Sequence, residues 1–169
     1  TAVDFTPGIR ARLHFARPRD VEPATGPPAG ALASEALVGV ATLGGAEGDR
    51  TLLHFLARPT TRSPQGEHGV KVPALGPFNR VVAARDAYPQ SLPLGVIRLG
   101  TFTLVATPTE NSTLTAWRIR EALGSPPHGA LEIVSMANEY ASYLATADEY
   151  AVQDYMGAST LWGPQQAAF

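Results

Sequence analysis

The chain has 169 residues, of which 44% are hydrophobic and 17% are charged. This composition excludes a disordered chain and provides enough apolar material for one sizeable core. Thirteen Lys and Arg against 15 Asp and Glu give a net charge of -2, so we expect no nucleic acid partner. Cysteine is absent, which excludes disulfides and thiolate metal sites, and no apolar run approaches membrane-spanning length.

The first half of the chain has the patterns of short strands and loops. Residues 9–15 alternate strictly between apolar and polar side chains, which predicts a strand with one buried face. Residues 18–30 contain four prolines and two glycines, which predicts an exposed loop. Short apolar runs bounded by Gly, Pro and Asp predict further strands at 36–42, 51–57 and 70–75.

The strongest strand signal lies at 94–107, where two apolar runs flank Gly100 and predict a β-hairpin. A helix follows, capped by Asn111 or Ser112 and ending at Gly124. Its predicted buried stripe consists of Leu114, either Trp117 or the stem of Arg118, Ile119 and Leu123.

A buried strand is predicted at 131–137, before a further helix whose start is marked by a capping box of Thr146 and Glu149. Strands and helices alternate over this part of the chain. The order predicts an α/β fold, with a mixed sheet and helices packed on it.

Glu110 directly follows the predicted hairpin, where a loop can present a functional group on a rigid scaffold. The simpler interpretation is a carboxylate near a helix N-terminus, favoured by the helix dipole. Spacing alone favours the simpler interpretation.

Four of the five tyrosines lie within residues 140–155, at Tyr140, Tyr143, Tyr150 and Tyr155. A phenol has a pKa of about 10, so it ligates a metal at neutral pH only beside a cation such as zinc. These tyrosines also fit a core role, in which buried hydroxyls bond to the backbone.

The four histidines, His14, His54, His68 and His128, are not spaced as zinc-binding pairs. We interpret each of them as a surface or turn residue. The residues alone therefore predict no complete metal site.

The segment that carries the four tyrosines contains a longer sequence pattern. Residues 138–164 read Asn-x-Tyr-x-x-Tyr-x-x-Thr-x-x-Glu-Tyr-x-x-Gln-x-Tyr-x-Gly-Ala-Ser-Thr-x-x-Gly-Pro, which resembles the signature near the end of the catalytic domain of neutral ceramidases. Residues 99–110, with Thr113 and 118–122, resemble the strand, turn and helix that precede this signature in the family. Residues 36–49 are similar, more loosely, to the family segment that follows the nucleophile region.

Neutral ceramidases are zinc-dependent amidases that split ceramide into a sphingoid base and a fatty acid. By position, the resemblance implies that Glu110 and Tyr143 are zinc ligands and that Tyr155 lies beside the scissile amide and assists its cleavage. It further implies ceramide or a related N-acyl lipid as substrate, peripheral contact with a membrane, and a secreted or extracytoplasmic location.

The family's two zinc histidines and its nucleophile segment belong to the amino-terminal half of the catalytic domain, and nothing in residues 1–169 resembles them. We therefore expect the chain to be the carboxyl-terminal portion of one catalytic domain and to be inactive without the other half. Such a portion should expose a large apolar face where its partner half docks.

Three positions depart from the family pattern. Thr109, Asn111 and Met156 stand where a glycine, an aromatic and an acidic residue are common. These departures motivate a second hypothesis, a metal-free and non-catalytic lipid-binding or scaffold relative. A third hypothesis is a hydrolase of another N-acyl lipid.

Overall fold

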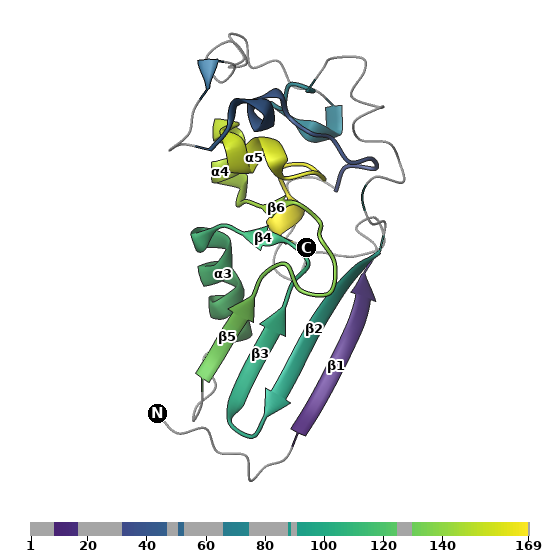
Figure 1. Cartoon of the computed structure of the whole chain (residues 1–169), viewed down its shortest axis with the longest axis vertical. Coiled ribbons are helices and arrows are strands. Elements are labelled where there is room, and N and C mark those ends of the chain that lie inside the picture. The colour runs from purple at the N-terminus through teal and green to yellow at the C-terminus, as the bar shows by residue number, and fades with distance from the viewer. Residues whose placement is uncertain are drawn as a thin grey trace.

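The computed structural model describes residues 32–46, 51–52, 66–74, 88, 91–124 and 130–168, together with the backbone of 9–16. The main sheet contains β1 (Ile9–Ala16), β2 (Leu92–Leu99), β3 (Phe102–Ala106) and β5 (Ala130–Val134). A second sheet pairs β4 (Glu110–Asn111) with β6 (Tyr143–Leu144). The α-helices are α3 (Thr113–Leu123), α4 (Ala147–Val152) and α5 (Tyr155–Ser159), and 3-10 helices span Val40–Gly44, Gly66–His68 and Gln166–Ala168. In Figure 1 the main sheet fills the lower half, α4 and α5 lie in the upper half, and β4 and β6 lie between them.

The predicted hairpin is confirmed. β2 and β3 pair antiparallel with Leu99 opposite Phe102, so Gly100 and Thr101 form a two-residue turn. Gly100 takes a φ of 60°, a left-handed value that glycine reaches without a Cβ clash. The strand predicted at 9–15 is also confirmed, because β1 pairs antiparallel with β2 along its whole length.

A crossover through α3 makes the sheet mixed. β3 pairs parallel with β5, from Phe102 opposite Ala130 to Ala106 opposite Val134. The strand order is β1-β2-β3-β5, and α3 contacts β5. The predicted α/β fold with a mixed sheet and packed helices is therefore confirmed.

The predicted helix ends are confirmed as well. Ser112 rather than Asn111 caps α3, because its Oγ accepts a hydrogen bond from the Thr115 N–H at 3.1 Å. Gly124 ends this helix at a φ of 68°. Both hydrogen bonds of the capping box of Thr146 and Glu149 are present at the start of α4.

The helices α4 and α5 pack closely because Gly157 has no side chain. A Cβ atom there would lie 2.7 Å from the Glu149 carbonyl oxygen, closer than Cβ atoms approach any neighbour. The main apolar cluster joins segments that are far apart in the sequence: Val38, Ala74, Ala141, Leu161 and Trp162. It fixes the segment that carries the tyrosines against residues 32–46 and 66–74.

The predicted strands at 36–42 and 70–75 are wrong for the residues that the structure describes. Gly39 and Pro73 form one isolated antiparallel bridge, and a 3-10 helix begins at Val40. Proline has no N–H to continue a ladder, so this pairing stops after one bridge. Most of 51–57 and all of the predicted loop at 18–30 lie outside the described residues.

Two predictions of burial are also wrong. In α3, Trp117 is 66% exposed and Leu123 is exposed, whereas the polar Thr115 is buried. In β5, which is shorter than the predicted 131–137 strand, Leu131 is buried but Val134 is exposed.

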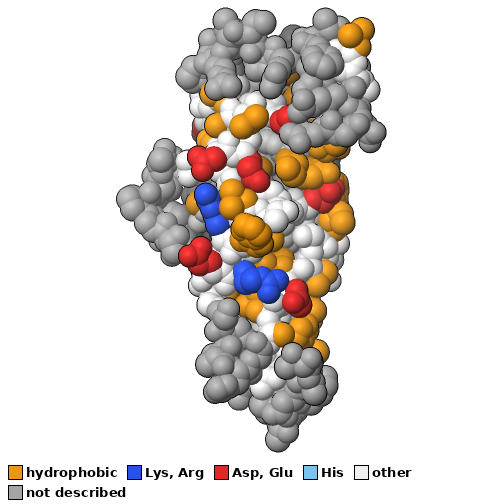
Figure 2. Space-filling view, turned by 90° about the vertical axis from the view of Figure 1, so that its left-hand side faces the viewer, with side chains coloured by type: hydrophobic (Ala, Val, Ile, Leu, Met, Phe, Trp, Pro, Cys, Tyr) orange, Lys and Arg blue, Asp and Glu red, His pale blue; other side chains and the backbone are white. Residues whose placement is uncertain are grey.

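Figure 2, which views the side carrying α3 and α4, shows hydrophobic side chains along the middle of the face among charged ones. The docking of a partner half on an apolar face stays a prediction.

Among the described residues, no helix combines the length and apolar character needed to cross a membrane.

His68 ends a 3-10 helix and is a turn residue as predicted. Its Nδ1 atom is buried and has no hydrogen-bond partner within the described part of the chain. Burial lowers the pKa of His68 to about 4, and the nearby Lys71 charge acts in the same direction.

Because the pKa of His68 is about 4 in the folded state and about 6.5 in the unfolded chain, the unfolded state binds more protons between these values. We expect stability to be lost as pH falls from about 6.5 towards about 4, and His68→Phe to lose less over this interval. Urea unfolding of the intact protein at pH 7 and pH 4.5 measures the difference. Equal losses in both proteins would contradict this role of His68.

Candidate functional site

The site forms where β4 and β6 pair, between the main sheet and the helices α4 and α5 (Figure 1). Their parallel register places Glu110 directly opposite Tyr143, so the two side chains share one face of this small sheet. The Glu110 N–H donates to the Ser142 carbonyl at 2.9 Å. Two residues far apart in the sequence are thereby fixed by backbone pairing.

The loop between β5 and β6 holds a strained backbone. Met136, Asn138 and Ser142 have φ values of 56°, 67° and 59°, in the left-handed region that costs non-glycine residues about 1–3 kcal/mol each. The loop is fastened to the 107–110 turn by three further backbone hydrogen bonds, Met136 N to Thr109 O at 3.1 Å, Ala137 N to Thr107 O at 2.9 Å and Ala141 N to Pro108 O at 2.8 Å. These bonds hold Tyr140 and Tyr143 beside Glu110.

Tyr140 contacts the candidate carboxylate directly. Its hydroxyl donates to Glu110 Oε1 at 2.6 Å. Burial raises the pKa of Tyr140 to about 12, and the hydrogen bond and charge of Glu110 contribute further. Tyr88, which packs against the main apolar cluster, adds a smaller electrostatic contribution.

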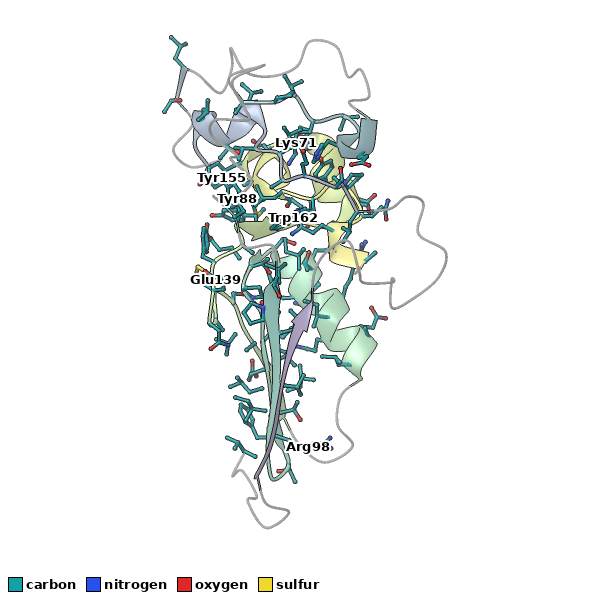
Figure 3. All side chains as sticks on the ribbon, turned by 90° about the vertical axis from the view of Figure 1, so that its right-hand side faces the viewer. Lys71, Tyr88, Arg98, Glu139, Tyr155 and Trp162 are labelled. Carbon is teal, nitrogen blue, oxygen red and sulfur yellow. The ribbon has the colours of Figure 1, made fainter. Side chains whose placement is uncertain are left out.

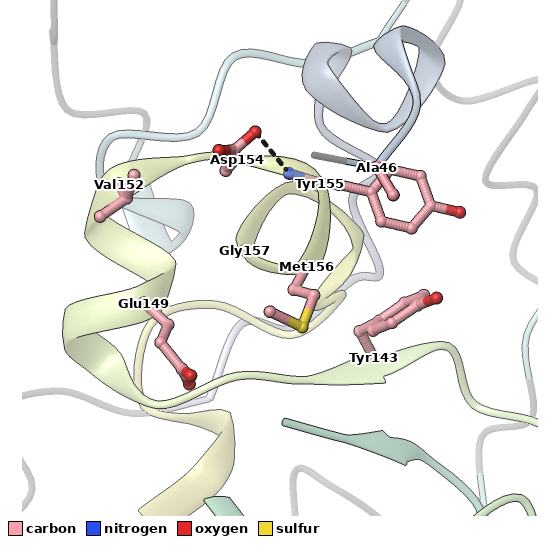
Figure 4. Close-up of a pocket in the computed structure, with 8 residues that line it drawn as sticks. All are labelled: Ala46, Tyr143, Glu149, Val152, Asp154, Tyr155, Met156 and Gly157. Atoms are coloured by element: carbon pink, nitrogen blue, oxygen red, sulfur yellow. Dashed lines mark hydrogen bonds between the residues drawn. The ribbon is translucent and has the colours of Figure 1, made fainter. Parts of the chain in front are cut away.

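Tyr143 lies opposite Glu110 in the small sheet and contacts the ring of Tyr155. Burial raises the pKa of Tyr143, followed by its hydrogen bond to the Glu110 carboxylate and the charge of that group. The rings of Tyr143 and Tyr155 meet edge to face, with centroids 5.3 Å apart and planes at 79°. In Figure 4 the hydroxyls of these two tyrosines point towards the same side.

A pocket of about 480 Å³ opens beside the tyrosine pair. Val152, Met156 and Ala46 supply apolar wall (Figure 4), and Glu149 and Asp154 also line it. Asp154 caps α5, because its carboxylate accepts a hydrogen bond from the Tyr155 N–H.

Glu149 joins the starts of both helices that flank the site. Its Oε2 accepts hydrogen bonds from the Ser112 hydroxyl at 2.7 Å and from the Thr146 N–H at 2.8 Å. Although burial opposes the change, these bonds lower the pKa of Glu149. An anionic Glu149 therefore links the residue that caps α3 to the residue that caps α4.

The unusual residues around Glu110 fit the turn. Thr109 is buried and has no left-handed backbone, and its hydroxyl donates to Asn111 Oδ1 at 2.8 Å. Asn111 Nδ2 donates to Thr107 Oγ1 at 2.8 Å and to Ser135 Oγ at 3.1 Å. A polar network thus supports Glu110 without the glycine and aromatic residues common in the family.

The donor set at the site fits a cation. The strand register places the Glu110 carboxylate beside the Tyr143 phenol, and these two groups together could hold a divalent cation. Within the described ranges, no group of three or more His, Cys, Asp or Glu could hold a metal. Since zinc takes about four ligands, further donors would have to come from outside these residues.

The structure brings together all three site residues predicted from the sequence, Glu110, Tyr143 and Tyr155. It adds Tyr140 and Tyr88, which the sequence analysis did not assign to the site. Figure 3 places Tyr88 and Tyr155 in the upper half of the molecule, with Glu139 of the site loop below them. Tyr140 had a sequence signal, since it belongs to the same tyrosine cluster, but Tyr88 had none.

The chain is similar to known proteins in sequence and in fold. The model of the family described as "Neutral/alkaline non-lysosomal ceramidase, N-terminal" matches residues 29–169. The neutral ceramidase of Pseudomonas aeruginosa is 42% identical over 86 residues, which cover 48% of this chain and 13% of that protein. The neutral ceramidase of Mycobacterium tuberculosis is 32% identical over 114 residues, covering 66% of this chain and 17% of that protein.

Two solved structures resemble the fold over 95% of this chain. A "Ceramidase complexed with C2" matches with a TM-score of 0.64 and 25% identity, over 28% of its own length. The crystal structure of the neutral ceramidase from Pseudomonas aeruginosa matches with a TM-score of 0.60 and 26% identity, over 26% of its length. The chain thus spans a minor part of the proteins that it matches. It belongs to the neutral/alkaline non-lysosomal ceramidase family.

Proposed function

We propose that the intact protein is a zinc-dependent amidase that hydrolyses the N-acyl bond of ceramide to a sphingoid base and a fatty acid. The observation that carries the proposal is the convergence of Glu110, Tyr143 and Tyr155 at one edge of the small sheet. Membership of the ceramidase family supports the reaction class.

Glu110 and Tyr143 would hold the zinc, and residues of the amino-terminal half of the catalytic domain would complete its ligands. When bound, zinc polarises a carbonyl oxygen and makes water acidic enough to provide hydroxide near neutral pH. Glu110 contributes an anionic oxygen whose orientation is fixed by Tyr140. Tyr143 would contribute its phenol oxygen, which holds a cation as the phenolate after giving its proton to the solvent.

Tyr155 would act on the amide itself. Its ring is braced against Tyr143, so its hydroxyl has a defined direction beside the proposed metal ligands. Donation of that hydroxyl to the carbonyl oxygen, as negative charge develops there, stabilises the transition state more than the substrate.

The pocket beside the tyrosine pair would take apolar substrate next to the scissile bond. Its volume, about 480 Å³, lies within the range of small-molecule sites, and the exposed side chains of Val152 and Met156 line it. A lipid substrate implies that the protein contacts a membrane surface peripherally, and we propose a secreted or extracytoplasmic location on the same family grounds.

Turnover by the intact protein tests the proposed reaction. Purified protein is incubated with ceramide, with an N-acyl ethanolamine and with a fatty-acid ester, and the released fatty acid is quantified. We expect kcat/KM for ceramide to exceed the other two values by at least about tenfold, or about 1.4 kcal/mol of transition-state discrimination. Preference for the ethanolamide would favour a hydrolase of another N-acyl lipid. Lipid binding without any turnover would favour the non-catalytic relative.

Tyr140→Phe tests the support of Glu110. The phenylalanine ring keeps the packing but removes the 2.6 Å hydrogen bond to Oε1. Partners that orient a metal ligand are typically worth about 10–100-fold in metal affinity, so we expect zinc affinity to fall by about this factor. Chelator competition measures it, with Tyr150→Phe as a control because that hydroxyl bonds to the His68 carbonyl away from Glu110. Unchanged affinity in Tyr140→Phe would remove Tyr140 from the site.

A further inference from the structure

Lys71 is the only lysine among the 13 Lys and Arg residues of the chain, and it is completely buried. Its Nζ atom donates hydrogen bonds to the carbonyl oxygens of Leu37 and Ala158, both at 3.0 Å, and of Thr160. It also lies 4.9 Å from the centre of the Tyr150 ring. Figure 3 places Lys71 in the upper half of the molecule, above Trp162 in that view.

The three acceptors identify the protonation state that this geometry needs. An ammonium group has three N–H donors, whereas a neutral amine has two and could not satisfy all three carbonyls. Burial lowers the pKa of Lys71, but the three carbonyl dipoles and the ring face of Tyr150 favour the charged form. A guanidinium has its donors in a planar fork and cannot direct three bonds from one nitrogen in this way.

Two of the three carbonyls held by Lys71, those of Ala158 and Thr160, belong to the end of α5 and the residue beyond it. The last carbonyls of a helix have no partner within the helix, and a cation there also interacts favourably with the helix dipole. Ser142 Oγ donates to the intervening carbonyl of Ser159 at 2.7 Å. All three consecutive carbonyls at this helix end are therefore fixed by side chains.

This anchoring reaches both site tyrosines. Tyr155 is the first residue of the same five-residue helix, so fixing the helix end fixes the position of its ring. Thr160 forms a parallel bridge with Tyr143, and its Oγ1 accepts a hydrogen bond from the Ala145 N–H at 3.1 Å. The ammonium group thus bonds to the end of the helix that carries Tyr155 and to the residue that bridges Tyr143.

We propose that Lys71 is a positioning residue that sets the edge-to-face contact of Tyr143 and Tyr155 by holding the carbonyls of Ala158 and Thr160. The catalytic consequence rests on the proposed amidase function, whereas the geometric consequence does not. Two independent measurements therefore separate them.

Lys71→Met and Lys71→Arg in the intact protein test the proposal by NMR of ring-labelled tyrosine, with Tyr143→Phe and Tyr155→Phe used for assignment. We expect the Tyr143 and Tyr155 signals to shift in both variants, since neither side chain can bond all three carbonyls. We also expect kcat per folded molecule to fall by about 100-fold, with KM changed by less than about threefold, as for a misplaced catalytic group.

Val105→Ala is the matched control, because Val105 is buried in β3 and its truncation destabilises the protein without touching the Lys71 contacts. It should leave the tyrosine signals and kcat per folded molecule unchanged. Unshifted tyrosine signals in a folded Lys71→Met or Lys71→Arg protein would overturn the proposal. A wild-type protein that cleaves no amide, but whose tyrosine signals shift in the variants, would overturn the proposed function alone.

If neither variant folds, the NMR signal of the Lys71 ammonium group in the wild-type protein tests the proposal. A buried ammonium bonded to three carbonyls is expected to show a slowly exchanging ¹⁵N-ammonium signal at neutral pH, unlike lysines in contact with water. Absence of any protected ammonium signal would overturn the proposal.

Discussion

Replacing Glu110 by glutamine is expected to lower the kcat/KM of the intact protein for ceramide by more than about 100-fold. The change keeps the size of the side chain and its acceptor for Tyr140, but it removes the anionic charge at the point where β4 faces Tyr143. Outer partners of a metal ligand already account for about 10–100-fold, and the ligand itself should account for more. Steady-state kinetics with ceramide in mixed micelles measures the loss.

Glu139→Gln is the matched control for this change. Glu139 lies on the same site loop, is exposed, and its Oε1 accepts a hydrogen bond from the adjacent Tyr140 N–H at 3.2 Å. It should keep activity within about twofold, since exposed charges contribute little. Wild-type kinetics for Glu110→Gln would mean that the small sheet does not form the active centre.

Tyr155→Phe is expected to reduce kcat by about 100–1,000-fold while KM and bound zinc stay unchanged. This is the loss expected when one donor to a developing oxyanion is removed, corresponding to about 2.7–4 kcal/mol. The phenylalanine ring preserves the edge-to-face packing on Tyr143, so the proposed metal ligands should be undisturbed. Pre-steady-state and steady-state measurements on the same protein distinguish kcat from KM.

Tyr150→Phe controls for loss of a tyrosine hydroxyl elsewhere in the same segment. Tyr150 is buried and donates to the His68 carbonyl at 2.8 Å, so its variant should lose stability but keep kcat per folded molecule. If Tyr155→Phe raises KM and spares kcat, Tyr155 binds substrate and does not stabilise the transition state.

The features that could be predicted from the sequence are those set by nearby residues. The turn at Gly100 and the caps at Ser112 and Thr146 depend on contacts within a few positions, and all three are confirmed. The predicted strand at 36–42 failed because Gly39 finds only one bridge, with Pro73, more than thirty positions away. Local patterns do not contain that long-range information.

Which side chains are buried, and which residues surround the site, also depend on tertiary contacts that the sequence pattern does not show. Trp117 has the spacing of a buried residue, yet nothing among the described residues covers it. The resemblance assigned roles to Glu110, Tyr143 and Tyr155, and the paired strands place them together. The contacts of Tyr140 and Lys71 were missed because they are long-range: the Tyr140 hydroxyl lies 30 positions from its acceptor, and Lys71 lies 87 and 89 positions from two of its carbonyl partners.

Zinc content of the intact protein tests the central claim most directly. Elemental analysis should find about one zinc per molecule in the wild-type protein, and this zinc should be lost in Tyr143→Phe, which removes the phenol oxygen opposite Glu110. Zinc that is absent from the wild-type protein, or retained in full by Tyr143→Phe, would contradict a metal centre built on Glu110 and Tyr143.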